Sequence, residues 1–371
     1  MEWKYTQPVP IYFGNGQLES LHERINERKY KKGLLVAGTH FVGSREAKLL
    51  MENKKNHLGD IFSGFSENPE VEEVDVCARI LLRGKFDFVV AVGGGSVIDG
   101  AKAAAVLVFS EVPAEEYHGT GKMLPQKRLP VIAVPTTAGT GSEVTNVAVL
   151  SNREKGLKAP LVSDNFYPVC AVVDPELTIT MPPYLTACTG IDVLSHAVEG
   201  YWSRGHQPIC DALAVHSIKQ VFRYLQRACR DSKDMEAREG MCEASVIAGM
   251  AFGLPKTTSS HACSFPLTNL YHIPHGEACG LTLDFFIRLN GKADKRTQEL
   301  ARTLGFKNSD EMADKVYELK RNIGLRTDLK DMKLGRESIE GLISFSHHPN
   351  LLNNPVKVTD EVLLSLYEGL C

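Results

Sequence analysis

The sequence lacks long apolar runs, a dominant sign of charge and paired cysteines. No apolar run approaches the roughly 20 residues that a membrane-spanning helix needs, and residues 1–6 lack the basic-then-apolar pattern of a signal peptide. The 42 basic and 45 acidic residues nearly cancel, which argues against nucleic acid or an anionic membrane as a partner. Nine scattered cysteines without a C-x-x-C pair indicate reduced thiols, so we expect a cytoplasmic protein.

The remaining composition is that of an ordinary globular protein with room for two domains. Of the 371 residues, 43% are hydrophobic and 23% are charged. At roughly 100–200 residues per domain, this length favours two domains over one. Membrane, fibrous, disordered and disulfide-scaffold classes are therefore excluded.

The first half of the chain alternates short apolar segments with helical patterns. The segment at 86–92 is apolar on both faces and runs into three glycines, as a buried parallel strand does. We expect strands at residues 11–13, 34–37, 60–62, 86–92, 129–134 and 170–173, and helices at 45–57, 71–83 and 101–107. Alternation of this kind predicts a doubly wound, Rossmann-like parallel sheet.

The second half has a helical pattern and no further convincing strand from about residue 183. We place the boundary near residue 180. Residues 1–180 would form an α/β dinucleotide-binding domain, and residues 181–371 an all-α domain.

Two loops rich in glycine and hydroxyl side chains follow predicted strands. Gly93, Gly94, Gly95 and Ser96 open a helix, where the glycines allow close approach of a ligand and the free N–H groups favour a pyrophosphate. The second loop runs from Pro135 to Thr145. Loops at the carboxyl ends of parallel strands mark the crevice in which such sheets bind ligands. The alternatives are a tight strand–helix turn without a ligand and a flexible linker.

One carboxylate and three histidines form a candidate metal site. Asp192 and His196 are four residues apart in a helical stretch and therefore share a face, while His261 and His275 follow in later segments. This donor set suits a borderline divalent ion such as Fe²⁺ or Zn²⁺. The alternative is that each histidine is an ordinary surface or core residue.

These segments together resemble the iron-containing, or group III, alcohol dehydrogenases along nearly the whole chain. The segments that carry the resemblance are Ile11–Gly16, Glu67–Pro69, Gly93–Lys102, Pro135–Thr145, Val173–Glu176, Thr189–Asp192 with His196, Pro274–Gly276 and Asn354–Pro355. The resemblance implies a dinucleotide-binding domain followed by a helical metal and substrate domain, in a dehydroquinate synthase-like fold. It also implies reversible NAD(P)-linked oxidation of an alcohol by a homodimer.

The resemblance assigns roles to single residues. The metal ligands would be Asp192, His196, His261 and His275, with Fe²⁺ as the expected ion and Zn²⁺ as the alternative. The pyrophosphate would lie at Gly93, Gly94, Gly95 and Ser96. The phosphate and nicotinamide would lie against Thr136, Thr137 and Thr140. The cofactor cleft would be lined by Asn68, Asp99 and Lys158.

Two departures from the family pattern concern the substrate and the cofactor. Many members carry a further histidine near the substrate where this chain has Phe265, and His272 is the nearby replacement candidate. NAD-preferring relatives usually place an aspartate after the first Rossmann strand, where this chain has Gly38, Thr39 and His40. Without that carboxylate a 2′-phosphate meets no repulsion, which favours NADP(H) over NAD(H).

The third departure is a basic, hydroxyl-rich segment directly before His261. Lys256 and Ser260 belong to this segment, which reads Pro-Lys-Thr-Thr-Ser-Ser over residues 255–260. A lysine and four hydroxyls beside the metal could hold an anionic substrate, whereas the alternative is an exposed helix cap. The pattern is similar to the phosphonoacetaldehyde reductase branch of the family.

The sequence thus predicts metal-dependent, NAD(P)H-linked reduction of a small aldehyde, such as phosphonoacetaldehyde to 2-hydroxyethylphosphonate. The metal would polarise the carbonyl oxygen as a Lewis acid. A general alcohol or diol dehydrogenase is the nearest alternative, and a dehydroquinate-synthase-like lyase or a silent binding protein fits the motifs less well.

Overall fold

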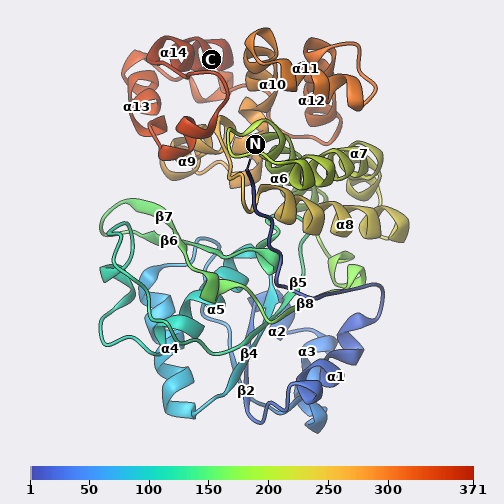
Figure 1. Ribbon diagram of the computed structural model, residues 1–371, viewed down its shortest axis with the longest axis vertical. Coiled ribbons are helices and arrows are strands. Elements are labelled where there is room, and N and C mark those ends of the chain that lie inside the picture. Colours follow the sequence, from blue (N-terminus) through green and yellow to red (C-terminus); the bar gives the residue numbers. More distant parts are fainter. Residues whose placement is uncertain (1) are drawn as a thin grey trace. The chain divides into compact units, whose positions relative to one another are not determined.

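The computed structural model describes residues 2–371, which divide into two compact units (Figure 1). The sheet unit comprises Thr6–Thr137 and Ser142–Thr178. The helical unit comprises Ile179–Cys371, the N-terminal residues up to Tyr5 and the short segment Ala138–Gly141. The chain therefore passes between the units at several points rather than once.

The sheet unit is built on six parallel strands in the order β1-β8-β5-β4-β2-β3. The strands are β1 (Ile11–Phe13), β2 (Gly33–Ala37), β3 (Leu58–Phe62), β4 (Phe88–Gly93), β5 (Val131–Pro135) and β8 (Cys170–Val173). All six residues of β4 are buried, as its apolar character on both faces requires. The predicted parallel α/β sheet is confirmed.

Helices cover both faces of this sheet (Figure 1). They are α1 (Leu21–Glu27), α2 (Thr39–Val42), α3 (Arg45–Glu52), α4 (Val71–Gly84) and α5 (Gly95–Leu107). Because side chains alternate along a strand, Val89 packs in the core with α4 and α5, whereas its neighbour Val90 packs in the core with α1 and α3. The sheet is thus the middle of three layers.

A two-stranded hairpin, β6 (Val147–Asn152) paired antiparallel with β7 (Leu157–Val162), was not expected from the sequence. The expected helix at 45–57 is also shorter, because α3 ends at Glu52 and a 3₁₀ turn follows. His57 then adopts a left-handed conformation, with φ of 53°, and β3 begins directly after it at Leu58, earlier than expected. The short 3₁₀ turns are Gln17–Ser20, Lys54–Asn56, Ala114–Glu116, Ser142–Val144, Asp164–Phe166, Pro175–Thr178, Lys330–Met332 and Pro349–Asn353.

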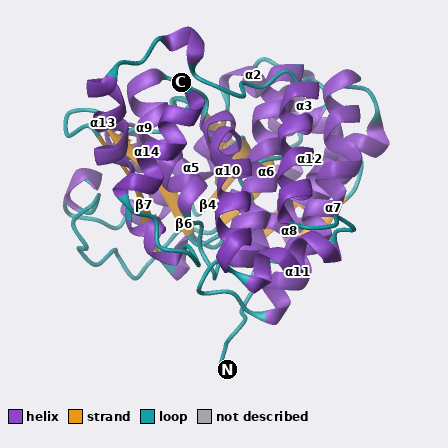
Figure 2. Ribbon diagram, turned by 90° about the horizontal axis from the view of Figure 1, so that it is seen from above, coloured by secondary structure: helices purple, strands orange, loops and turns teal. Residues whose placement is uncertain are grey.

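The helical unit contains no strand among its described residues, as expected (Figure 2). Its helices are α6 (Pro183–Trp202), α7 (Pro208–Arg230), α8 (Met235–Phe252), α9 (Ser259–Tyr271), α10 (His275–Ala293), α11 (Lys295–Thr303), α12 (Ser309–Asn322), α13 (Arg336–Ser346) and α14 (Asp360–Leu370). Helix α6 is buried along most of its length, including Asp192 and His196. Buried polar groups in such a helix need partners, which points to a function for them.

Glycines allow α10 to approach α6 closely. A Cβ atom at Gly276 would lie 2.0 Å from the carbonyl oxygen of Cys188, and one at Gly280 would lie 2.6 Å from Ile191 Cγ1. No other residue fits these positions without moving one helix away from the other. The two helices therefore hold their side chains at a fixed spacing.

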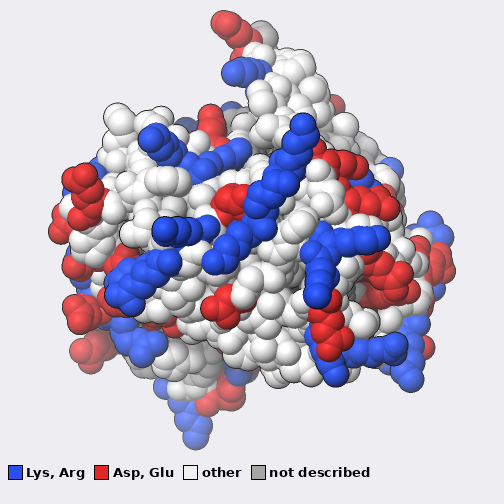
Figure 3. Space-filling model, turned by 90° about the horizontal axis from the view of Figure 1, so that it is seen from below, with Lys and Arg blue, Asp and Glu red and all other residues white. Residues whose placement is uncertain are grey.

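The surface and the cysteines agree with the sequence-based expectations on charge and thiols. Among the described residues, no helix combines the length and apolar character needed to cross a membrane. Lys and Arg side chains lie interspersed with Asp and Glu on the face that Figure 3 shows. All nine cysteines are free, and seven of them are buried.

Candidate metal and cofactor sites

Three helices of the helical unit bring together four side chains of types that can bind a metal ion. Asp192 comes from α6, His261 from α9, and His275 and Cys279 from α10, with one donor atom of each within 4.8 Å of all the others. Asp192 Oδ1 and His261 Nε2 are 3.6 Å apart. Three of the four predicted ligands therefore lie in one cluster, and a cysteine that was not predicted joins them.

His196, the fourth predicted ligand, lies beside this cluster. Its Nδ1 is 3.8 Å from Asp192 Oδ2, one turn earlier on α6. Its ring stacks on Phe252 with 4.1 Å between ring centroids, and its centroid is 4.5 Å from that of His261. The structure thus places His196 against two of the cluster residues, but none of its nitrogens belongs to the group of four.

Several buried polar atoms in and beside the cluster make no hydrogen bond within the described chain. They are Asp192 Oδ1, His196 Nδ1 and His261 Nε2. Buried polar atoms without partners are costly, so this arrangement fits a bound cation. Burial lowers the pKa of His196 to about 4, which keeps its lone pair available at neutral pH. Burial also raises the pKa of Asp192, but His196, His261 and His275 outweigh this effect and hold that pKa below its usual range.

Glu199, which was not predicted, fixes the orientation of His261. It is fully buried, and its Oε2 accepts a hydrogen bond from His261 Nδ1. Its Oε1 accepts hydrogen bonds from the Ser260 backbone N–H at 2.6 Å and from Thr258 Oγ1 at 2.8 Å. A proton held on Nδ1 leaves Nε2 of His261 as the free ligand atom.

Both missed residues carried a sequence signal. Cys279 follows His275 by four residues, the same spacing that identified Asp192 and His196. Glu199 lies seven residues after Asp192, again on the same helical face.

Phe265 stands between two histidines. Its ring is 6.3 Å from that of His275 and 4.7 Å from that of His348, measured between centroids. His348 Nδ1 accepts a hydrogen bond from the Asn350 backbone N–H, and burial lowers the pKa of His348. The replacement candidate His272 is exposed and ends α9 in a left-handed conformation. The structure thus places Phe265 against His275 and His348.

The basic, hydroxyl-rich segment before His261 is largely tied into the fold. Thr258 and Ser259 are fully buried, and Ser259 Oγ donates to Asn354 Oδ1 at 3.0 Å. Ser260 Oγ is buried without a hydrogen-bond partner. Lys256 has a φ of 69° and donates from Nζ to the Gly253 carbonyl oxygen at 2.8 Å.

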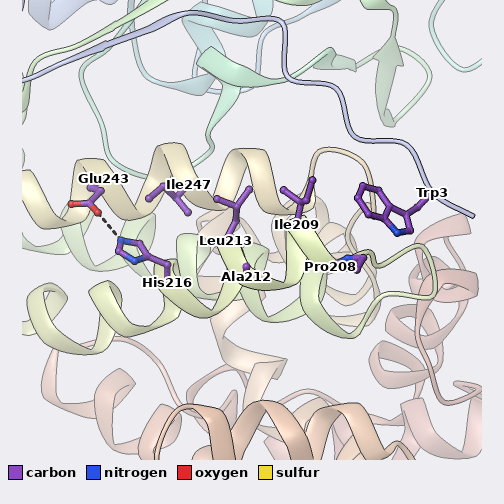
Figure 4. A pocket seen from close by; sticks show the side chains of 8 residues that line it. All are labelled: Trp3, Pro208, Ile209, Ala212, Leu213, His216, Glu243 and Ile247. Carbon is purple, nitrogen blue, oxygen red and sulfur yellow. Dashed lines mark hydrogen bonds and ion pairs between the residues drawn. The ribbon is translucent and has the colours of Figure 1, made fainter. Parts of the chain in front are cut away.

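Two surface hollows lie in the helical unit. One, of about 590 Å³, is lined in part by the basic side chains Arg204 and Lys357 and by His348. The other, of about 620 Å³, is mainly apolar and lies between α7, α8 and Trp3, with His216 bonded to Glu243 at its end (Figure 4). The basic hollow shares His348 with the surroundings of Phe265, whereas the apolar one contains no predicted site residue.

The predicted cofactor loops meet at one edge of the parallel sheet. Strands β2, β4 and β5 are paired so that Ala37 lies opposite Val92, and Gly93 opposite Pro135. Gly38, Thr39 and His40 follow β2, with Thr39 and His40 exposed. The segment from Gly93 to Ser96 follows β4 and begins α5, and Thr136 and Thr137 follow β5. A Cβ atom at Gly94 would lie 3.4 Å from Thr137 Oγ1, so the last two loops touch.

The other predicted cofactor residues differ in their surroundings. Lys158 Nζ donates to Asn68 Oδ1 at 2.7 Å, which brings these two together. Asp99 accepts from Ser142 Oγ and from the Val149 backbone N–H, and its Oδ1 lies 3.1 Å from Lys102 Nζ. Asp99 thus ties α5 to β6. Thr140 lies in the short segment that belongs to the helical unit.

Comparison with protein families gives two matches that together span most of the chain. Residues 8–175 match the model of iron-containing alcohol dehydrogenase. Residues 186–371 match that of the C-terminal part of the Fe-containing alcohol dehydrogenase family.

Individual relatives match over most or all of the chain. A solved structure of sulfoacetaldehyde reductase from Bifidobacterium kashiwanohense, in complex with NAD⁺, is 55% identical, with a TM-score of 0.97 over 100% of this chain and 99% of that chain. Alcohol dehydrogenase 4 of Saccharomyces cerevisiae is 34% identical, over 98% of this chain and 96% of its own. Sulfoacetaldehyde reductase of Bilophila wadsworthia is 31% identical, over 81% of each chain.

Proposed function

Because the chain belongs to the iron-containing alcohol dehydrogenase family, we propose that it reduces a small aldehyde bearing a sulfonate or phosphonate group to the primary alcohol. It is an oxidoreductase of a family that implies a divalent metal, iron, and NAD(H). The observation that carries the anionic substrate is the 55% identity with a sulfoacetaldehyde reductase along the whole chain. Phosphonoacetaldehyde stays the substrate predicted from the sequence.

Each unit has a proposed part in the reaction. When bound, the divalent metal would polarise the carbonyl oxygen, and the reduced nicotinamide would supply the hydride. Asp192, His261 and His275 would hold the metal, with His196 adjacent. The N-terminus of α5 would hold the pyrophosphate, because its free N–H groups and dipole favour an anion. The sheet unit would thus act as the dinucleotide-binding domain predicted for residues 1–180, and the helical unit as the metal and substrate domain predicted for residues 181–371.

The remaining predicted cofactor contacts are proposed on the same basis. They are Gly38, Thr39 and His40 at the adenosine end, Thr136, Thr137 and Thr140 at the phosphate and nicotinamide, and Asn68, Asp99 and Lys158 along the cleft. The homodimer, the cytoplasmic location and the absence of nucleic-acid or membrane partners stay predictions.

Lys256 is proposed to recognise the anionic end of the substrate. A hydrogen bond to a charged group is worth roughly 1.5–3 kcal/mol, or about 10–150-fold in affinity. Lys256→Ala should therefore raise KM for sulfoacetaldehyde and phosphonoacetaldehyde by about that factor. KM for a neutral aldehyde of similar size should hardly change. Steady-state kinetics with the three aldehydes measures both effects and shows which anion is preferred.

The matched control is Lys333→Ala. Lys333 is exposed, and its φ of 49° is left-handed like that of Lys256, so both variants replace a lysine in the same backbone conformation and add no strain to it. The control should leave KM for all three aldehydes unchanged. Equal shifts for charged and neutral aldehydes in Lys256→Ala, or faster turnover of the neutral aldehyde by the wild type, would favour a general alcohol dehydrogenase.

The preference for NADP(H) is tested at Gly38. Its φ of −65° is open to any residue, and a Cβ atom there would meet only Val97 Cγ2, at 3.7 Å. Gly38→Asp should fold normally but repel a 2′-phosphate, raising KM for NADPH at least ~10-fold while KM for NADH stays nearly constant. The NAD⁺ in the Bifidobacterium structure supports the opposite preference. A wild type that already strongly prefers NADH would refute the prediction from this loop.

A further inference from the structure

His348 lies one aromatic ring away from the candidate metal site. It precedes the 3₁₀ turn Pro349–Asn353, and its ring centroid is 4.7 Å from that of Phe265. The ring of Phe265 in turn is nearly parallel to that of His275, with an angle of 11° and 6.3 Å between centroids. His348 therefore contacts the position at which many family members carry a histidine near the substrate.

This separation suits a two-carbon aldehyde whose carbonyl oxygen lies at the metal. Such a molecule is about 5 Å long, and the contacts at its two ends add roughly 2–3 Å each. That span is comparable to the one between His275 and His348, which are linked through the two ring contacts of 6.3 Å and 4.7 Å. An anionic group at the far end of the aldehyde can thus reach His348.

The hydrogen bonding of His348 decides which of its ring nitrogens can donate. Nδ1 accepts a hydrogen bond from the Asn350 backbone N–H at 3.2 Å. Burial lowers the pKa of His348 more than the Asn350 side chain raises it, so the ring is neutral at pH 7. A neutral ring that accepts at Nδ1 carries its proton on Nε2. His348 therefore offers one directed donor without carrying a charge.

Two cationic side chains lie near His348. Arg204 and Lys357 line the same hollow of about 590 Å³ as His348 does. Arg204 donates from Nε to the Asn354 carbonyl oxygen at 3.0 Å. Among the described residues, neither Arg204 nor Lys357 forms an ion pair with a carboxylate. Their uncompensated charges favour an anion over a neutral ligand in this part of the helical unit.

We propose that His348 recognises the anionic group of the substrate by donating a hydrogen bond from Nε2 to a sulfonate or phosphonate oxygen. Arg204 and Lys357 would add the positive potential that attracts this group. The contact is directional, and it complements the charge proposed for Lys256. The inference rests on the proposed reduction of an anionic aldehyde, to which it adds a specificity-determining residue.

His348→Phe tests this contact, because phenylalanine keeps a ring beside Phe265 but has no donor. KM for sulfoacetaldehyde and phosphonoacetaldehyde should rise about 10–150-fold, the range for a hydrogen bond to a charged group, while KM for propanal stays nearly constant. Ethanesulfonate, which cannot react, should inhibit the wild type competitively, and its inhibition constant should rise by the same factor. His348→Gln should keep most of the affinity, since its amide group can donate in place of Nε2.

Two comparisons distinguish recognition from a merely structural effect. Both His348 variants lose the Nδ1 atom that accepts from Asn350, so a difference between them reports the donor at Nε2. His347→Phe is the matched control, because the adjacent His347 side chain is 51% exposed and its Nε2 lies 2.8 Å from Asp360 Oδ1. This control should leave the KM values of all three aldehydes unchanged.

The outcomes separate this inference from the proposed function. A wild type with equal kcat/KM for anionic and neutral aldehydes would overturn both. A preference for anionic aldehydes that survives in His348→Phe would overturn the role of His348 and leave the proposed function in place. The same holds for a loss that is equal for propanal, or that His348→Gln shares in full. A loss confined to the anionic compounds and largely restored in His348→Gln would support both.

Discussion

His275→Ala is expected to lose most of the bound metal and at least ~1,000-fold of kcat/KM for the aldehyde. His275 belongs to the cluster with Asp192 and His261. Loss of this side chain should weaken binding of the ion and leave the remaining buried donor atoms without a partner. The protein should still fold, because the sheet unit has its own buried core. Elemental analysis after dialysis, kinetics and circular dichroism together measure metal content, activity and folding.

His216→Ala is the matched control for this variant. His216 is a half-exposed histidine of the same unit, paired with Glu243 on the surface. Its loss should change neither metal content nor kcat/KM. Full metal occupancy and retained activity in His275→Ala would refute the assignment of the cluster as the metal site.

Glu199→Gln is expected to weaken metal binding about 10–100-fold. The carboxylate of Glu199 accepts a hydrogen bond from His261 Nδ1, and further hydrogen bonds from Thr258 Oγ1 and from the backbone N–H groups of Ser260 and His261. A glutamine keeps the volume but replaces one acceptor oxygen with a donor, so His261 loses its orientation and part of its basicity. Titration of the metal-free variant with a divalent ion measures the loss, and thermal melting measures any accompanying destabilisation.

Glu243→Gln provides the comparison on the surface. Glu243 Oε1 is also bonded to a histidine nitrogen, His216 Nε2 at 2.6 Å, but 50% of the His216 side chain is exposed. The metal affinity of Glu243→Gln should equal that of the wild type. If Glu199→Gln lowers the melting temperature but binds metal as tightly as the wild type, Glu199 has only a structural role.

The inner part of the parallel sheet could be predicted because β2, β4, β5 and β8 are fully buried and apolar. Val89 and Val90 face opposite layers, so the whole of β4 reads as one apolar run. The hairpin of β6 and β7 could not be recognised in this way. Its outer strand is half exposed and contains Pro160, so neither apolar continuity nor strict alternation identifies it.

The metal cluster could be predicted only in part. Helical spacing connected only Asp192 with His196, whereas His261 and His275 lie in later segments and joined the predicted set through their residue type and the family resemblance. Cysteine is common in protein cores, so the residue type of Cys279 alone did not indicate that it belongs to the cluster. Glu199 has its effect through hydrogen bonds between α6 and α9, and their packing cannot be read from one segment of sequence.

The four residues Ala138–Gly141 limit where the chain could be cut into two fragments that fold separately. A Cβ atom at Gly141 would lie 2.6 Å from Gly249 Cα, and one at Gly139 would lie 2.8 Å from Thr189 Cβ, so this segment packs tightly among α6 and α8. A gene split after Thr178 would therefore give a second fragment without a piece of its own interior. During synthesis Ala138–Gly141 leaves the ribosome before the helices that enclose it. The helical unit therefore needs a segment that is synthesised earlier than its own helices.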